Sequence, residues 1–310
     1  MAVISSRSSV LLIFLSAICI LIAPAVAGPT LLRYSCSDRQ GGKYSSGYKA
    51  NLNHLFSSLS SNSTEIDYGF YNSSYGEKPH EVYAIALCRG DLKPDECRNC
   101  LNISKDYLTL ERCPNEKEAM VWYDECMLRY SSRSIFSSME ETPEFFIVSI
   151  YNISAGDAKF EFNKDLWNLL QNLRDGAATG GSLRKFATGK VAAGPNFQTM
   201  NALVQCTPDL SEQDCSYCLR RAFENFWRSY AGAIGGRVLR PSCNFRFENF
   251  DFYHRTADAP SPLPPPASAP SPSLAPQGEK SHKPRIAIIL RVAAVLALVV
   301  LPVVSICIYL

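Results

Sequence analysis

The chain has 310 residues, of which 46% are hydrophobic and 19% are charged, and its formal net charge at pH 7 is +2. Acidic and basic residues are mixed along its length, so there is no basic stripe and no nucleic-acid partner is expected. The length is sufficient for two domains of ordinary small size.

The N-terminus has the order of segments found in a secretory signal, which we place at residues 1–27. Arg7 provides the positive start, Val10–Ile22 is an apolar run too short to cross a bilayer, and Ala25–Ala27 is a small-residue cleavage site. A buried N-terminal helix is the alternative. A cleaved signal would start the mature chain near Gly28 and bring it to an oxidising compartment, where cysteines persist as disulfides.

The most informative pattern is a spacing of three cysteines, C-x8-C-x2-C, that occurs twice at an interval of 118 residues. The two copies are Cys88, Cys97, Cys100 and Cys206, Cys215, Cys218. Of the 12 cysteines, Cys19 and Cys307 lie in the terminal segments, and the others divide into six in the first half and four in the second. Each half can therefore pair internally, and we predict one domain at 28–140 and another at 144–256.

Apolar stripes and the cysteine spacing predict two helices in each half. Leucines recur at i, i+3 and i+7, which gives one apolar helical face. These leucines are Leu52, Leu55, Leu59 and Leu166, Leu169, Leu173. A further helix is expected from Pro79 or Asn196 into each cysteine triplet, because the C-x2-C cysteines are about one helical turn apart.

Short β-prone runs surround these helices. They are 145–150, 237–239 and 244–252, the last with Phe245, Phe247 and Phe250 as apolar positions. Helices and strands without a regular β-α-β alternation predict an α+β fold with antiparallel sheets. We therefore expect two tandem small domains, each a sheet packed by two helices and held by disulfides.

Four Asn-x-Ser/Thr sequences predict N-glycosylation of a secreted chain, and hence surface positions. They begin at Asn62, Asn72, Asn102 and Asn152. The first three fall in the first predicted domain and the last in the second.

The composition changes after His254. Residues 259–276 contain eight prolines among Ser and Ala, so we predict an extended stalk at 257–285. Residues 286–310 are apolar apart from Arg291, and the 19 residues after this arginine are about long enough to cross a membrane. Three interpretations stay open: a membrane span whose cytoplasmic part is missing, a lipid-anchor signal, or a hydrophobic plug. We prefer the span.

The sequence offers no motif for catalysis or metal binding. Zinc ribbons place two C-x2-C pairs within about 20 residues, whereas the pairs here are more than a hundred residues apart. A kinase would need a Gly-rich phosphate loop, a catalytic Asp and a magnesium-binding Asp, which the sequence lacks. The histidines lie outside any hydrolase motif; they are His54, His80, His254 and His282. We therefore expect a non-enzymatic chain without cofactor or metal.

Two further segments, Gln205–Leu210 and Gly235–Glu248, extend the cysteine pattern. With the triplet, they resemble the ginkbilobin-homologous, stress-antifungal domain of plants. The tandem arrangement between a signal and a stalk resembles the ectodomain and transmembrane part of a cysteine-rich receptor-like kinase without its kinase domain. Plasmodesmata-located proteins and cysteine-rich repeat secretory proteins share the unit. The resemblance implies a small antiparallel sheet with two helices packed on it.

The resemblance also implies a disulfide order. The pairs would be Cys36 with Cys113, Cys88 with Cys97, Cys100 with Cys126, Cys206 with Cys215, and Cys218 with Cys243. The cysteines of one C-x2-C then have different partners, which favours structural disulfides over a redox centre. The second domain has Phe226–Ala231 where close relatives carry a cysteine, so we predict that it is less constrained than the first.

The same resemblance raises the question of mannose binding. Arg237 and Glu248 match two ligands of the family's mannose-binding member, but Ser37 stands where its Asn ligand would fall. The first domain has Met120 and Ser131 in place of the Arg and Glu. Neither copy keeps the full set, so we favour a structural salt bridge for Arg237 and Glu248.

Together these features predict a non-catalytic extracellular recognition module. It would be tethered to the plasma membrane by its C-terminal segment and would bind an apoplastic protein or glycan in plant stress or defence signalling. Association with itself or with related receptors is a further expectation. The alternatives are a secreted, apoplastic, antifungal mannose-binding lectin-like protein and a plasmodesmata-located protein.

Overall fold

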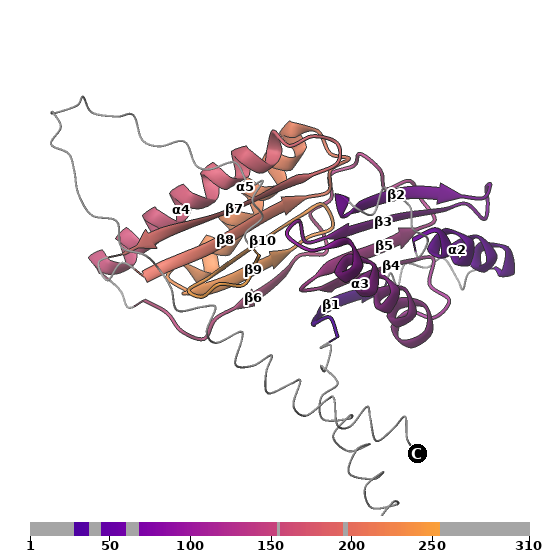
Figure 1. The fold of residues 1–310 in the computed structure, drawn as a ribbon, viewed down its shortest axis with the longest axis horizontal. Helices are drawn as coiled ribbons and strands as arrows, with labels where there is room; N and C mark the ends of the chain where they lie inside the picture. Colours follow the sequence, from indigo (N-terminus) through magenta and orange to yellow (C-terminus); the bar gives the residue numbers. More distant parts are fainter. Residues whose placement is uncertain (1–27, 37–44, 60–67, 154–155, 195–197, 255–310) are drawn as a thin grey trace, which may run out of the picture. The chain divides into compact units, whose positions relative to one another are not determined.

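The computed structural model describes residues 28–36, 45–59, 68–153, 156–194 and 198–254. They form two five-stranded antiparallel sheets, with strand orders β1-β4-β5-β3-β2 and β6-β9-β10-β8-β7 (Figure 1). Both sheets lie in one compact unit of the chain. The α+β fold, with two antiparallel sheets and two helices on each, is confirmed.

The first sheet consists of β1 (Leu31–Cys36), β2 (Phe70–Tyr75), β3 (Val82–Cys88), β4 (Glu118–Tyr123) and β5 (Cys126–Ser131). Its helices are α2 (Ser46–Leu59) and α3 (Pro94–Asp106), the latter continued by a π-helical turn, η2 (Tyr107–Arg112). The leucine stripe of α2 is buried, as predicted, in a core that it shares with α3 and one face of the sheet.

The second sheet consists of β6 (Phe145–Val148), β7 (Lys185–Ala193), β8 (Gln198–Cys206), β9 (Gly235–Leu239) and β10 (Cys243–Glu248). It packs against α4 (Asp157–Ala178) and α5 (Glu212–Tyr230). Leu166 and Leu173 are buried in this core, whereas Leu169 is only partly buried. The Ser211 hydroxyl caps α5 by accepting a hydrogen bond from the Asp214 amide at 3.0 Å, which stabilises the helix start.

The predicted helices from Pro79 and Asn196 are wrong in their starting points. The chain first runs through β3 and β8, and the helices begin only at Pro94 and Glu212. The error has a physical cause: β3 is a central strand with six of its seven residues buried, and such a continuous apolar run has no strand periodicity to separate it from a buried helix. The C-x2-C cysteines do lie on helices.

The strand predictions in the second half are confirmed at their centres. Residues 145–148, 235–239 and 243–248 form β6, β9 and β10. Phe245 and Phe247 are buried, but β10 ends at Glu248 and Phe250 is 53% exposed. The last strand is therefore shorter than its aromatic pattern indicated.

A third apolar cluster lies on the faces of the sheets that the helices leave free. Along β4, Ala119 and Val121 belong to the helix-covered core, while the alternate residues Met120 and Trp122 belong to the third cluster, as the pleat of a strand requires. Leu239 of the second sheet is buried in this cluster. The two sheets therefore share a core, and Trp122 Nε1 donates to the Arg240 carbonyl at 3.4 Å.

Several predicted features lie outside the described residues. They are the signal at 1–27, Ser37, Asn62, the stalk at 257–285 and the segment at 286–310. Within the ranges given above, none of the helices has the length and apolar character to span a membrane.

Candidate binding site

Among the residues that the structure describes, five disulfides hold the two helical layers to the sheets. The structure forms them between Cys36 and Cys113, Cys88 and Cys97, Cys100 and Cys126, Cys206 and Cys215, and Cys218 and Cys243. These are the pairs that the resemblance implies. Each C-x2-C therefore anchors one helix to two places on its sheet, and the cysteines form part of the scaffold.

Arg237 and Glu248, the two residues weighed above as sugar ligands and favoured as a salt bridge, come from neighbouring strands. Arg237 on β9 lies opposite Arg246 on β10, and Glu248 lies two residues further along β10. Arg246 Nε donates to Glu248 Oε1 at 3.0 Å, and Arg237 Nε is 3.8 Å from the same oxygen. The side chains of Arg237 and Glu248 are each 15% exposed. Both are therefore engaged within the protein.

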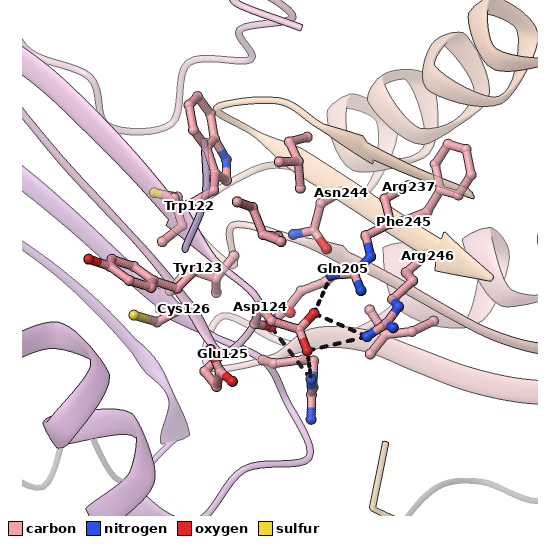
Figure 2. A pocket seen from close by; sticks show the side chains of 16 residues that line it. Trp122, Tyr123, Asp124, Glu125, Cys126, Gln205, Arg237, Asn244, Phe245 and Arg246 are labelled. Carbon is pink, nitrogen blue, oxygen red and sulfur yellow. Dashed lines mark hydrogen bonds and ion pairs between the residues drawn. The ribbon is translucent and has the colours of Figure 1, made fainter. Parts of the chain in front are cut away.

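A carboxylate of the first domain completes this cluster. Asp124 Oδ1 accepts hydrogen bonds from Arg237 and, at 3.1 Å, from Arg246 Nη1, while Asp124 Oδ2 accepts from Arg89 Nη1 at 3.1 Å (Figure 2). Arg89 also donates to Asp91, whose side chain is fully buried. We name these residues, with Glu248, the interdomain ion cluster. Three arginines thus converge on one aspartate where the two sheets meet.

Arg246 and Arg89 in this cluster have pKa shifts of opposite direction. Burial lowers the pKa of Arg246, and the positive charge of Arg237 adds to this effect, so that the attraction of Asp124 and Glu248 does not restore it. Burial acts in the same direction on Arg89, but its hydrogen bonds and charge interactions with Asp91 and Asp124 outweigh it and raise the pKa. Each arginine of the cluster still needs a carboxylate partner, because an unpaired buried charge destabilises the folded protein.

The cluster leaves little room for a ligand. The cavity between Trp122, Asp124, Arg237 and Arg246 has a volume of about 40 Å³, far below the roughly 300 Å³ at which ordinary ligand pockets begin. A sugar ring would have to displace the ion pairs. The structure thus supports the structural salt bridge rather than a mannose site.

The first domain has a related but separate arrangement. Arg129 on β5 lies opposite Met120, as Arg246 lies opposite Arg237, so Met120 does take the place of the arginine. Arg129 Nη2 donates to Glu118 at 2.8 Å and to Glu140 at 2.7 Å. Each sheet therefore carries one buried arginine on its helix-free face, and residues outside the sheet neutralise part of its charge.

The final described residues pass close to the ion cluster. The Phe252 ring lies 4.0 Å from the Arg246 guanidinium carbon, a cation–π contact. The Tyr253 hydroxyl donates to the Gly189 carbonyl at 3.1 Å, and the His254 amide donates to Asp91 Oδ2 at 2.7 Å. The segment that leads to the predicted stalk is thus attached to both domains.

An open groove lies elsewhere, between α4 and α5 (Figure 1 shows both helices on the second sheet). It has a volume of about 610 Å³. Its lining combines three aromatic rings with polar and charged side chains: Phe160, Asn163, Lys164, Trp167, Asn168, Glu224, Trp227 and Arg228. We name it the α4–α5 groove. The groove was not predicted from the sequence; the only signal for it is the spacing of Phe160 and Trp167, two helical turns apart.

The described glycosylation acceptors differ in exposure. Asn72 on the edge strand β2 and Asn152 before α4 are exposed, whereas Asn102 on α3 is half-buried. In the part of the chain that the structure describes, no group of three or more His, Cys, Asp or Glu side chains could hold a metal ion.

Comparison with known families decides where this fold belongs. The family model described as salt stress response/antifungal matches residues 35–133 and again 152–250. The chain belongs to this family. The stress-antifungal unit is thus present twice, once for each sheet, and the conclusion agrees with the resemblance of the cysteine motifs.

Known members of the stress-antifungal family include receptor-like proteins. Cysteine-rich receptor-like protein kinase 25 of Arabidopsis thaliana is 42% identical over 242 residues, which cover 77% of this chain and 35% of that protein. The chain thus spans about a third of the length of such relatives.

Two crystal structures show the same fold. Both are tandem DUF26 ectodomains of Arabidopsis thaliana cysteine-rich receptor-like proteins. That of PDLP8 is 21% identical with a TM-score of 0.59, and that of PDLP5 is 25% identical with a TM-score of 0.55. Each match covers 71% of this chain and 98% of the solved one. The comparisons support an extracellular receptor-like module.

Proposed function

We propose that the chain is a non-catalytic recognition module, tethered at the extracellular face of the plasma membrane, that senses an apoplastic protein or glycan in stress or defence signalling. The observation that carries the proposal is the tandem pair of stress-antifungal units, 42% identical to part of a receptor-like kinase. The sequence contributes a predicted secretory signal at 1–27 and an apolar segment at 286–310, which are the features that secretion and tethering require.

The structure supports recognition rather than catalysis. The buried charged groups at the meeting of the two sheets are engaged in ion pairs, and the cysteines of both triplets are in disulfides. A mannose-binding lectin is less well supported, because Arg237 and Glu248 have protein partners. The module would transmit a signal by associating with a partner once a ligand is bound.

The test uses the full chain with an epitope tag inserted after Gly28, produced in plant cells. Proteinase added to intact protoplasts should remove the tag, and the protein should stay with membranes at alkaline pH until detergent is added. Release of the protein from membranes by phospholipase C would show that a lipid anchor, rather than a membrane span, holds it there. Recovery of the intact protein in the apoplastic wash would contradict tethering, and protection of the tag would contradict the extracellular location.

A further inference from the structure

The α4–α5 groove has the composition of a binding site rather than of a plain helix junction. Trp167 and Trp227 meet edge to face with ring centroids 5.4 Å apart, and Trp167 also contacts Phe223 of the core at 6.3 Å. The two indoles are only partly buried, so one part of each packs inward and the rest lines the groove. Phe160, two helical turns before Trp167, is 70% exposed. Core packing does not account for so much aromatic surface.

The aromatic residues form a row along α4. Phe160, Lys164 and Trp167 follow a spacing of about one turn, which places them on one face of the helix. Seven residues of helix correspond to roughly 10 Å, a distance that two linked pyranose rings span. An exposed ring face suits the apolar C–H face of a sugar, and the groove is long enough for more than one ring.

The charges at the groove select an acidic ligand. Glu224 is its one carboxylate, and this group is shared between Arg220 at 3.0 Å and Arg221 at 3.2 Å. Lys164 and Arg228 are exposed, and neither has an ion-pair partner among the residues that the structure describes. The uncompensated charge of the groove is therefore positive, and a carboxylate ligand would make charge-assisted hydrogen bonds with it.

Amide groups add hydrogen-bonding capacity beside the rings. Asn163 Oδ1 accepts from the Gly232 amide at 3.0 Å, which leaves its NH₂ group to donate into the groove. Asn168 is exposed on the same helix. Aromatic faces with a few polar groups and a net positive charge suit a ring that bears both hydroxyl groups and a carboxylate.

The corresponding positions on the described helices of the first domain do not form this surface. When its leucine stripe is aligned with that of α4, Ser46 and Asn53 take the places of Phe160 and Trp167, and Thr109 takes the place of Trp227. The two helical layers thus have the same scaffold but different outer surfaces. The aromatic row is specific to the second domain.

We propose that the α4–α5 groove binds an oligosaccharide that contains uronic acid residues. This inference rests on the proposed extracellular function and gives it a ligand class. The sugar rings lie against Phe160, Trp167 and Trp227, and their carboxylates pair with Lys164 and Arg228.

The test measures binding to the full chain, purified in detergent micelles, by calorimetry and by quenching of tryptophan fluorescence. Two of the three tryptophans line the groove, so fluorescence reports on it directly. The probe is a linear oligomer of galacturonic acid, compared with the same oligomer after reduction of its carboxylates to alcohols. The acidic oligomer should bind about tenfold more tightly than the reduced one, because the reduced oligomer loses a charge-assisted hydrogen bond when its carboxylates become alcohols.

Variants on the exposed rim separate binding from folding. Lys164→Gln with Arg228→Gln should weaken the acidic oligomer about tenfold and remove the preference over the reduced one. Phe160→Ala should weaken both oligomers. Tyr217→Ala removes another exposed aromatic of α5 that lies outside the groove, and should leave binding unchanged. All these side chains are at the surface, so unchanged melting temperatures are expected.

Three results would overturn the inference. They are the absence of binding at millimolar oligomer, binding that none of the rim variants weakens, and equal binding of a polyglutamate peptide through the same residues, which would make the groove a site for acidic peptides. If the chain is extracellular and tethered but no oligomer binds, only the ligand class is wrong. If the protoplast experiment places it elsewhere, the proposed function fails whatever the groove binds in vitro.

Discussion

The two domains have the same strand order but close the same corner by different means. In the first, the disulfide between Cys36 on β1 and Cys113 after η2 joins the edge strand to the helical layer. In the second, Val148 takes the place of Cys36. Cys36 follows the residue that pairs with Met120, and Val148 follows the residue that pairs with Arg237, which is equivalent to Met120. Residues 230–231 take the place of Cys113, and the second domain therefore has no covalent bond here.

Aromatic packing occupies that corner instead. The Phe226 ring lies within 6.4 Å, centroid to centroid, of five other rings: Phe146, Trp227, Tyr230, Phe245 and Phe247. A side chain at Gly236 would overlap Phe226, which explains one glycine of the Gly235–Gly236 pair. A covalent link in the first domain and a close-packed ring cluster in the second thus occupy the same corner, where the edge strand meets the helical layer. The expectation that the second domain is less constrained stays a prediction.

The largest effect should come from removing the centre of the aromatic cluster. Phe226 is 1% exposed, so Phe226→Ala leaves a cavity and should lower the free energy of unfolding by about 3 to 5 kcal/mol. Urea unfolding without reductant measures it. Phe250→Ala is the matched control, because that ring is 53% exposed, and should cost about 0.5 kcal/mol. Equal losses for the two variants would show that the cluster does not replace the disulfide.

The next effect concerns the covalent solution. Cys36→Ser with Cys113→Ser opens a loop with a sequence separation of 77 residues and should cost about 2 to 4 kcal/mol. Hydrogen exchange followed by mass spectrometry should show the loss of protection mainly in β1 and η2. Protection lost equally from β6 and β9 would mean that the two corners are not independent, and would contradict the comparison.

The sequence predicted the scaffold well because its signals are local or covalent. Cysteine spacing needs no knowledge of distant residues, and the leucine stripe of α2 shows its buried face directly. The predicted start of the second helix in each domain was wrong because β3 and β8 are central strands. Burial on both faces of such a strand removes the alternation of apolar and polar residues that identifies a strand.

The ion cluster could be predicted only in part. Arg237 and Glu248 were singled out, and a salt bridge was favoured, but the main partner Asp124 is 113 residues from Arg237 in sequence. The contact exists only because the two sheets share a core. Likewise, the α4–α5 groove combines residues of two helices, and the spacing of Phe160 and Trp167 within α4 does not show which faces of the pair stay open.

The contact between the domains provides the third prediction. Asp124→Asn leaves Arg89, Arg237 and Arg246 around a neutral side chain and should cost about 2 kcal/mol, less than for a fully buried pair, because Asp124 is 21% exposed. Asp251→Asn breaks an ion pair whose carboxylate is 73% exposed and should cost less than about 0.5 kcal/mol. Thermal unfolding at low salt gives the shift in melting temperature for each of the two variants. Equal shifts would mean that the cluster contributes no more to stability than a surface ion pair.

The smallest effect is a pH dependence confined to the first domain's own arginine cluster. Burial alone would raise the pKa of Glu140, but hydrogen bonds from Arg133 and Arg129 and their positive charges outweigh it, and the pKa is lowered. A lowered pKa means that Glu140 stabilises the fold above the pKa of the unfolded chain, and that this contribution is lost as the pH falls through the folded pKa.

Glu140→Gln should therefore cost about 1 kcal/mol at pH 7, with the difference from the unmodified chain shrinking below about pH 5. Glu77→Gln, at an exposed position, is the control for melting curves between pH 7 and 3. A difference that stays constant over this range would show that packing of the Glu140 side chain, rather than its charge, joins the segment between β5 and β6 to the first sheet.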